Sequence, residues 1–387
     1  MKRCDHSQWL TLFSQGIETA LHESDRLQTL VDQIPSPDSQ HPSLSVLIGS
    51  TAKSVALHEL VPSTKAAKVK SRRRHGDVHL YLEASTIFHD RPVLFAEGDL
   101  PFHGSRNKTF PAEKCHETVK RTLFRLREDV PGNQQDSIAN NLYSRLLCPF
   151  ADVICIFAAD FAGFRPIVRH LGSWLEKGLP SSLPKSTHPW LIIVTETTKL
   201  RDTVQEGTKK LFLSMLKDET TQDISTLFSE VEVLCILPDG QVSAKARFRP
   251  LKECLMNAST QVRLNKMDTR TLFSARHFAV FFKLACDHFA ITSNEPFDFI
   301  RTSRCLNPVS PDLNKHLSNF LLNIRSSDEL TKFAVPVIAS SFLLDSYPPD
   351  MHGTLVFILA RTWRLTLQQF SAQLRYSRLF IERPVMR

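Results

Sequence analysis

The sequence predicts an α/β protein in which helices cover both faces of a mostly parallel β-sheet, followed by a helical carboxy-terminal unit. Between about residues 40 and 249, short apolar runs alternate with longer stretches at helical spacing. From about residue 250 onward the strand-like runs stop and apolar residues recur at helical spacing. A chain of 387 residues with 42% hydrophobic and 23% charged residues has the composition of a globular protein and the length for two domains.

The first 39 residues are predicted to lie outside the sheet. Within residues 7–34, Trp9, Leu12, Phe13, Ile17 and Leu21 fall near helical spacing, which favours one amphipathic helix. The following segment "IPSPDSQHP" carries three prolines, which is typical of a linker. We therefore expect residues 1–39 to form a helix and a linker, and residues 40–249 to form the α/β domain.

The α/β region contains apolar runs of strand length, most of them separated by helix-like stretches. The exception is the gap "IFHDR", which cannot hold a helical crossover and predicts an antiparallel hairpin between its flanking strands. The expected strands are 44–49, 77–86, 92–98, 152–159, 190–195 and 231–237, and the expected helices are 53–61, 114–128, 135–148, 164–177 and 201–217.

Residues 250–353 are expected to form a helical domain. Its segment "LFSARHFAVFFKLACDHFA" carries aromatic residues at helical spacing, which indicates a helix packed into a core rather than a cofactor site. Residues 354–387 form a basic tail with six arginines and one acid, Glu382. Two interpretations of this tail stay open: a basic helix, or a non-native end produced by truncation or by a misread gene.

The stretch "SLSVLIGSTAKSVALHELVP", residues 43–62, has the local order strand, glycine, lysine-serine, helix. This is the order of a phosphate-binding loop, G-x-x-x-x-G-K-[ST], in which backbone N–H groups wrap the phosphates and the lysine reaches them. The loop is one residue short, and Ala52 stands where the second glycine belongs. The candidate nucleotide-binding residues are Gly49, Ser50, Thr51, Ala52, Lys53 and Ser54.

The strand 92–98 ends in "VLFAEGDL", where a magnesium-binding acid would belong. Glu97 or Asp99 could reach Mg²⁺ through water, while the hydroxyl of Ser54 would bind it directly. The alternative is a loop acid that caps the next helix. The predicted metal-binding residues are thus Ser54, Glu97 and Asp99, and the predicted ligand is GTP or another purine nucleotide with Mg²⁺.

Two later loops bear on recognition of a base. The segment "VTETTKL" after strand 190–195 lacks the lysine and the aspartate of a guanine-reading loop. Ser243-Ala244-Lys245, after strand 231–237, resembles the SAK loop of GTPases. In its order of elements the chain resembles a P-loop GTPase of the Ras/dynamin-like type with degraded nucleotide signatures. That resemblance implies a P-loop NTPase-like fold for residues 40–249.

A second resemblance concerns whole segments, from about Leu44 to His352. The segments "PVLFAEGDLPFH", "LYSRLLCPFADVICIFAADFAGFRPIVRHLGSWLEKG", "ARHFAVFFKLACDHFA" and "FAVPVIASSFLLDSYPPDMH" are similar to the amino-terminal region of large fungal proteins with a patatin-like (FabD/lysophospholipase-like) domain further along. The catalytic signature of that family is a G-x-S-x-G elbow with an aspartate partner. The sequence contains no G-x-S-x-G, so the resemblance does not bring lipase chemistry to this chain.

Three functional hypotheses follow. The first is a degenerate nucleotide-binding, GTPase-like module with a regulatory or assembly role. The second is a pseudo-NTPase, a protein-interaction scaffold of the same fold that binds no nucleotide; Ala52 and the missing base-reading loop favour it. The third is a remnant of a patatin-like lipid acyl hydrolase without its catalytic domain. The sequence shows no residue set for catalysis, so little enzymatic activity is expected in this chain, and a weak NTPase activity stays open.

Charge and targeting signals constrain the partners. The net charge is +8 and the pI about 9.1, but lysine and arginine are spread along the chain, so nucleic acid is not favoured. The run "KAAKVKSRRRH" at 65–75 is interpreted as a solvated loop, with nuclear localisation as the alternative. The expected partners are a nucleotide, a protein or a second copy of the chain.

The eight cysteines occur singly, and the chain start "MKRCDHSQWLTLF" has no unbroken apolar region. No stretch reaches the roughly 20 apolar residues of a membrane span. These observations predict a cytoplasmic protein with reduced thiols. Cys115, His116, Cys286, His288 and His316 lack the paired spacing of a zinc site.

Overall fold

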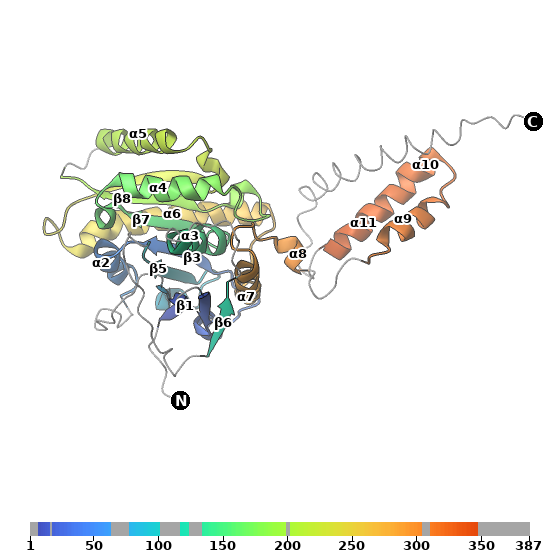
Figure 1. The fold of residues 1–387 in the computed structure, drawn as a ribbon, viewed down its shortest axis with the longest axis horizontal. Helices are drawn as coiled ribbons and strands as arrows, with labels where there is room; N and C mark the ends of the chain where they lie inside the picture. The colour runs from blue at the N-terminus through green and yellow to red at the C-terminus, as the bar shows by residue number, and fades with distance from the viewer. Residues whose placement is uncertain are drawn as a thin grey trace, which may run out of the picture. The chain divides into compact units, whose positions relative to one another are not determined.

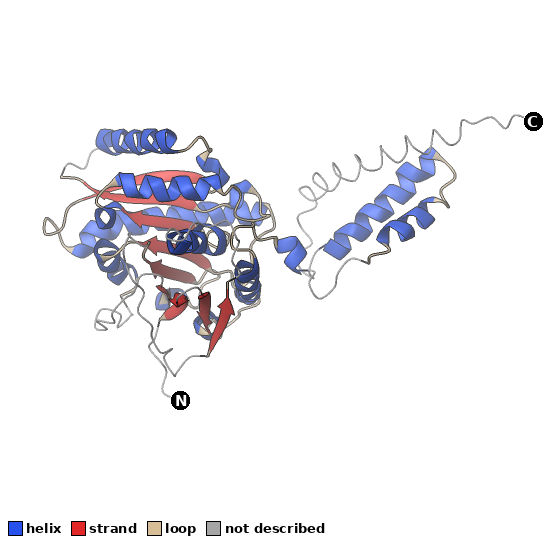
Figure 2. Cartoon of the chain, in the orientation of Figure 1, coloured by secondary structure: helices blue, strands red, loops and turns tan. Residues whose placement is uncertain are grey.

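The computed structural model describes residues 7–15, 18–62, 77–100, 117–123, 134–198, 202–303 and 310–346. The chain divides into two compact units. The first comprises residues 1–267 and 272–299, and the second comprises residues 268–271 and 300–387. Figure 1 labels their elements, and Figure 2 shows the strands and helices of each unit.

The first unit is built on one sheet with nine strands among its described residues, in the order β6-β2-β1-β4-β5-β3-β7-β8-β9. The six strands expected from the sequence are all present, with ends that differ by a few residues from the expected ones. The strands are β1 Gln8–Gln15, β2 Glu18–Ser24, β3 Ser43–Ile48, β4 Asp77–Leu82, β5 Val93–Gly98, β6 Thr118–Thr122, β7 Val153–Phe157, β8 Trp190–Glu196 and β9 Glu230–Ile236.

The sheet has a parallel half and an antiparallel half, so the expectation of a mostly parallel sheet is corrected to a mixed one. Strands β5, β3, β7, β8 and β9 pair in parallel. Strands β6, β2, β1, β4 and β5 pair antiparallel. The antiparallel pairing of β4 with β5 confirms the hairpin expected from the short gap "IFHDR".

Helices cover both faces of the sheet, as expected. Along β3 the apolar side chains alternate: Val46 and Ile48 enter one core, and Leu47 enters the core on the opposite face. Because both faces are covered, the central strands β3 and β7 are buried along their whole length. The helices of the first unit are α1 Arg26–Val31, α2 Thr51–Leu60, α3 Gln134–Asn141 with a π-helical continuation Leu142–Leu147, α4 Phe164–Glu176, α5 Asp202–Glu219, α6 Ala244–Asp268 and α7 Ala275–Ile291.

The two cores use different helices. The α2 and α6 helices pack on one face, for example through Leu57 and Leu251. The α1, α3, α4, α5 and α7 helices contribute to the core on the other face, for example through Leu171 and Phe212. The loops at the carboxyl ends of the parallel strands therefore lie between two helical layers, which is where open α/β sheets place ligand sites.

The prediction of one amphipathic helix over residues 7–34 is wrong. The segment forms the antiparallel hairpin β1–β2 and the short helix α1, and β1 joins β4 at the antiparallel end of the sheet. Trp9, Leu10 and Leu21 are buried in the core that this hairpin shares with α1 and α7. The helical spacing misled because the shorter two-residue period of Leu10 and Leu12, with the β-favouring Thr11 between them, is the one that the structure follows.

Two further expectations are corrected. The predicted helix 114–128 contains the edge strand β6, whose sequence "TVKRT" is rich in β-branched residues. The predicted domain boundary between residues 249 and 250 falls inside α6, whose buried face belongs to the sheet domain. The first unit extends to residue 299.

Aromatic side chains on and around α7 form a compact cluster within the first unit. Phe150 lies in ring contact with Phe278, Phe282 and Phe299, at centroid distances of 5.5, 5.1 and 5.3 Å. The ring of Trp9 is tilted against that of Phe282, at a centroid distance of 4.3 Å. The interpretation of this aromatic segment as core is confirmed.

Among its described residues the second unit is helical, as expected. Within this unit, the ring centroids of Phe320 and Phe333 lie 6.2 Å apart. The elements are α9 Leu313–Leu321, α10 Ser327–Glu329 with a π-helical continuation Leu330–Ala334, and α11 Val335–Ser346; the short helix α8, Phe299–Ser303, spans the division between the units. The basic tail 354–387 and the basic run 65–75 lie outside the described residues.

Candidate phosphate-loop site

The predicted phosphate loop connects β3 to α2 and lies between β5 and β7, the two parallel neighbours of β3. The backbone N–H of Gly49 donates to the carbonyl of Gly98 at the end of β5, at 3.1 Å. Gly49 has φ +151°, a backbone conformation that side-chain-bearing residues rarely adopt. The glycine therefore sets the turn from strand to helix, as the sequence predicts.

The N–H groups that would wrap a phosphate are engaged by a carboxylate of the protein itself. Asp160 follows β7, and its Oδ2 accepts from the N–H of Ser50 at 2.7 Å and of Lys53 at 3.1 Å. Its Oδ1 accepts from the N–H of Ala52 at 2.9 Å. Because these amides lie at the amino-terminal end of α2, the helix dipole also favours a negative charge there.

The Lys53 side chain points away from solvent and is engaged by acids of β5. Its ammonium group donates to Asp99 Oδ1 at 2.8 Å and to the carbonyl of Gly98 at 3.2 Å. It also forms an ion pair with Glu97 Oε2 at 3.4 Å. Lys53 is 2% exposed and Glu97 1%, so this is a buried ion pair with Asp99 at its more open side.

Two tyrosines complete the surroundings of these acids. The Tyr81 hydroxyl on β4 donates to Glu97 Oε1 at 2.8 Å, and the Tyr143 hydroxyl donates to the carbonyl of Asp99 at 3.2 Å. Burial raises the pKa of Tyr143 well above its usual value, and the nearby carboxylate of Asp99 adds to that shift. Tyr143 is therefore a neutral hydrogen-bond donor at physiological pH.

The hydroxyl of Ser54 donates back to the carbonyl of Ser50 at 2.6 Å, within the first turn of α2. Each of the predicted metal-binding residues Ser54, Glu97 and Asp99 thus forms a hydrogen bond or an ion pair with another group of the protein. In the part of the chain that the structure describes, no group of three or more His, Cys, Asp or Glu residues could hold a metal ion.

At the ends of β8 and β9, where a nucleotide base would be read, an arginine crosslinks the strands. Arg247 is 5% exposed, and its guanidinium donates to Glu196 at 2.5 Å and to the carbonyl of Leu237 at 2.8 Å. The SAK-like residue Lys245 is exposed at the start of α6. Arg247, which was not predicted from the sequence, therefore joins Glu196 in the segment "VTETTKL" to the residue that follows β9.

A phosphate group does not fit this site as it is folded. The three amides are engaged by Asp160, and the ammonium of Lys53 is engaged by Asp99 and Glu97. One cation stands against three carboxylates, so the local charge repels an anion. The loop carries Gly49, Lys53 and Ser54 in the predicted order, but three of its amides and its lysine are bound by carboxylates of the protein.

Of the predicted site residues, Gly49, Lys53, Glu97 and Asp99 meet at the carboxyl ends of β3 and β5, whereas the Ser54 hydroxyl bonds within the first turn of α2. Three residues of the site were not predicted: Asp160 in the turn after β7, Tyr81 on β4 and Tyr143 in the π-helical segment. A signal for Asp160 exists: the acid in "FAADFAG" follows the strand that neighbours β3. Only the strand order makes that signal specific.

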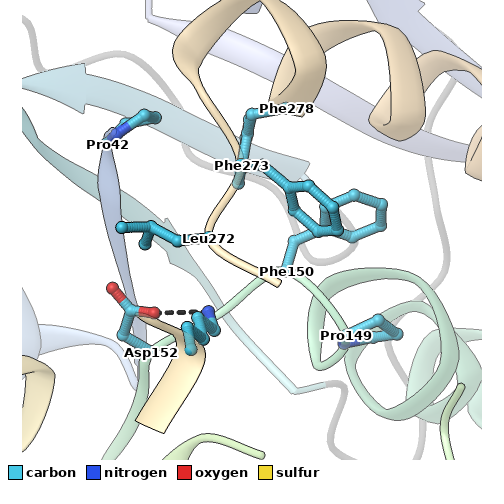
Figure 3. A pocket seen from close by; sticks show the side chains of 8 residues that line it. Pro42, Pro149, Phe150, Asp152, Leu272, Phe273 and Phe278 are labelled. Carbon is cyan, nitrogen blue, oxygen red and sulfur yellow. Dashed lines mark hydrogen bonds and ion pairs between the residues drawn. The ribbon is translucent and has the colours of Figure 1, made fainter. Parts of the chain in front are cut away.

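Other candidate chemistry finds no site in the described residues. The cavity shown in Figure 3 measures about 10 Å³ and lies beside the ion pair of Asp152 and Lys266, which are 2.5 Å apart. That volume holds at most a water molecule.

The described cysteines are free thiols, as expected: Cys148, Cys155, Cys235, Cys254 and Cys286. Among the described residues, no helix combines the length and the apolar character that a membrane span requires.

Comparison with known proteins gives distant likenesses. No protein-family model and no curated protein matches the sequence. A crystal structure of an SsGBP variant is 10% identical, with a TM-score of 0.28 over 62% of this chain and 66% of that chain. The siderophore hydrolase EstA from Aspergillus nidulans is 11% identical, with a TM-score of 0.24 over 66% and 94%.

A structure of an oligomerised bacterial dynamin pair is 10% identical, with a TM-score of 0.25 over 92% of this chain and 62% of that chain. Likenesses at this level carry no argument about fold or function. The chain spans 66% of the length of the SsGBP structure. The resemblance to patatin-like proteins stays a prediction.

Proposed function

We propose that the chain is a nucleotide-free, GTPase-like module that serves as a protein-interaction scaffold. The observation that carries this proposal is the position of Lys53, whose ammonium group is buried and bound by Asp99 and Glu97. In a working phosphate loop the lysine reaches the phosphates. Here it would have to leave two carboxylates, one of them 1% exposed, before it could contact a ligand.

The arrangement of strands supports the GTPase-like part of the proposal. From β4 to β9 the sheet runs β4-β5-β3-β7-β8-β9, and β4 alone in this set is antiparallel to its neighbour. One antiparallel strand beside a parallel set is what the resemblance to small GTPases implies. The loop after β3 carries Gly49, Lys53 and Ser54 in the order of a phosphate loop.

Exposed apolar side chains support the interaction part. Met256, Leu264 and Met267 lie at helical spacing on α6 and are 58%, 47% and 47% exposed. Their opposite helix face packs on the sheet through residues such as Leu251 and Leu255. An apolar row of this kind suits contact with another protein.

Calorimetric titration of the full chain with Mg²⁺ and GTP, GDP or ATP tests the proposal. The expected result is no binding heat with any of the three, which corresponds to a Kd weaker than about 1 mM. Circular dichroism on the same sample must show folded protein. A Kd below about 100 μM for any of these nucleotides contradicts the proposal.

The second candidate is a degenerate nucleotide-binding module with a regulatory or assembly role. The order Gly49, Lys53, Ser54 at the start of α2 favours it, because a helix amino terminus attracts phosphate groups. The engaged state of Lys53 and of the loop amides argues against it. No observation in the described residues favours the third hypothesis, the patatin-like remnant.

A further inference from the structure

The Asp160 carboxylate lies where the phosphate of a ligand would have to lie. It accepts three hydrogen bonds from loop amides, at 2.7, 2.9 and 3.1 Å, and those amides have no acceptor within α2 because they belong to its first turn. We propose that Asp160 is an intramolecular latch, an autoinhibitory contact that closes the β3–α2 loop to phosphate-bearing ligands. This inference rests on the proposed nucleotide-free function and names the group that enforces it.

The loop is shaped around this carboxylate. A Cβ placed on Gly49 would lie 2.5 Å from Asp160 Oδ2, closer than real Cβ contacts. Any larger residue at position 49 would push the carboxylate away from the amides. The missing side chain at Gly49 therefore permits the contact, in addition to allowing the positive φ.

The segment that delivers Asp160 holds it close to the loop. Asp160 lies in a 3₁₀ turn, Ala158–Phe161, that directly follows β7, the parallel neighbour of β3. The turn ends with Ala162 at φ +54° and Gly163 at φ +107°, and α4 begins at once. Because the carboxylate is tethered, it competes with a dissolved anion at a high effective concentration.

The latch also changes the local charge. With Asp160 in place, its carboxylate lies on the backbone amides of the loop, while Glu97 and Asp99 bind the ammonium group of Lys53. Removal of Asp160 frees three N–H donors and removes one negative charge, while Lys53 keeps its contacts with Asp99 and Glu97. The Asp160→Ala variant is therefore expected to bind a small phosphate compound that the wild-type chain excludes.

Hydrogen exchange of the full chain tests the contact directly. In wild type, the amides of Ser50, Ala52 and Lys53 are expected to be protected, and in Asp160→Ala they should exchange at least about tenfold faster. The amide of Ser54 is the internal reference, because it bonds to the carbonyl of Ser50 within the helix. Unchanged protection of the three amides in the variant overturns the latch.

Titration with inorganic pyrophosphate, with and without Mg²⁺, tests the exclusion. Asp160→Ala should bind at least about tenfold more tightly than wild type, since three charge-assisted hydrogen bonds become available to the ligand. Asp218→Ala, at an exposed position of α5, is the matched control because it removes the same charge far from the loop in sequence. It should bind as weakly as wild type.

The outcomes separate this inference from the proposed function. If neither wild type nor Asp160→Ala binds pyrophosphate, the latch is overturned and the nucleotide-free function stands. If wild type binds nucleotide, the proposed function fails; equal affinity in Asp160→Ala then overturns the latch as well. Asp160→Asn, which keeps the volume but cannot accept from all three amides, replaces Asp160→Ala if that variant does not fold, and it should show faster exchange at the same three positions.

Discussion

The two halves of the sheet each contain a buried cation that bridges acids, but the two clusters lie in different structural settings. In the parallel half, Lys53 joins Glu97 and Asp99 at the carboxyl ends of the strands. In the antiparallel half, Arg121 on β6 joins Glu23 on β2, at 2.8 Å, and Asp287 on α7, at 2.5 Å. The first cluster occupies a place where α/β sheets bind ligands, whereas the second fastens a helix to the sheet.

The clusters also differ in exposure. The side chain of Glu97 is 1% exposed, while that of Asp287 is 52% exposed and can be solvated without its partner. Loss of the cation leaves Glu97, at 1% exposure, without its partner in the parallel half, whereas in the antiparallel half it leaves Glu23, at 11%, and the more exposed Asp287. The comparison shows that Lys53, which the sequence predicts to bind a ligand, is instead held by acids at the end of the neighbouring strand.

The largest effect is expected for Lys53→Met. The substitution leaves Glu97 and Asp99 without their cation, so the free energy of unfolding should fall by about 3–5 kcal/mol. Urea denaturation of the full chain measures this loss.

The double variant Lys53→Met, Glu97→Gln is the control. It should recover part of the stability, because the stranded charge is gone and the two changes are coupled. An unfolding midpoint equal to wild type in Lys53→Met alone would mean that the acids do not hold the lysine, and the comparison between the halves would break.

Acidification should weaken the parallel half more than the antiparallel half. Burial, with a smaller contribution from Lys185, lowers the pKa of His188 from 6.5 to about 4. The unfolded chain therefore binds a proton below pH 6.5 that the folded chain refuses until about pH 4. Stability should fall as pH drops through this window, by on the order of 3 kcal/mol from this group.

Thermal unfolding of His188→Gln from pH 7 to pH 4 measures this contribution. The variant should show a shallower loss of stability than wild type over that range. His22→Gln, in the antiparallel half, is the matched comparison, because burial also lowers the pKa of His22 but less strongly. Equal pH profiles for wild type and His188→Gln would show that His188 does not contribute to the loss of stability at low pH.

Arg121→Met should cost about 2 kcal/mol, less than Lys53→Met, because Asp287 remains accessible to water. Hydrogen exchange should accelerate in β2 and β6 while α2 keeps its protection. Lys120→Met, an exposed neighbour on the same strand, is the control and should change little. A loss as large as that of Lys53→Met would show that the exposure of the partners does not set the difference.

The smallest effect is expected on the surface of α5. Glu206 and Lys210 form an i,i+4 pair at 3.7 Å with exposed side chains. Glu206→Ala should change the free energy of unfolding by less than about 0.5 kcal/mol, because solvent screens the pair. A loss above 1 kcal/mol in urea denaturation would show that exposure is a poor guide to the strength of ion pairs in this protein.

The central strands and the phosphate-loop path were predictable because their signals are local. Apolar runs such as "DVICIF" mark strands buried on both faces, and Gly49 before Lys53 marks a turn into a helix. The hairpin of residues 8–24 was not predicted, because Trp9, Leu12 and Leu21 fall near helical spacing and the two-residue period of Leu10 and Leu12 is short. Pairing with β4 and packing against α7 decided between them.

The sequence by itself determined that Gly49, Lys53 and Ser54 follow a buried strand and that acids end the strand 92–98. Only the tertiary structure decided what these groups do, because their partners come from distant segments: Asp160 follows β7, and Tyr81 belongs to β4. Hydrogen bonds and ion pairs depend on distances of about 3 Å, which strand order and register set. The residue pattern along the chain predicts which groups of a loop can donate hydrogen bonds, whereas the fold determines which acceptors bind them.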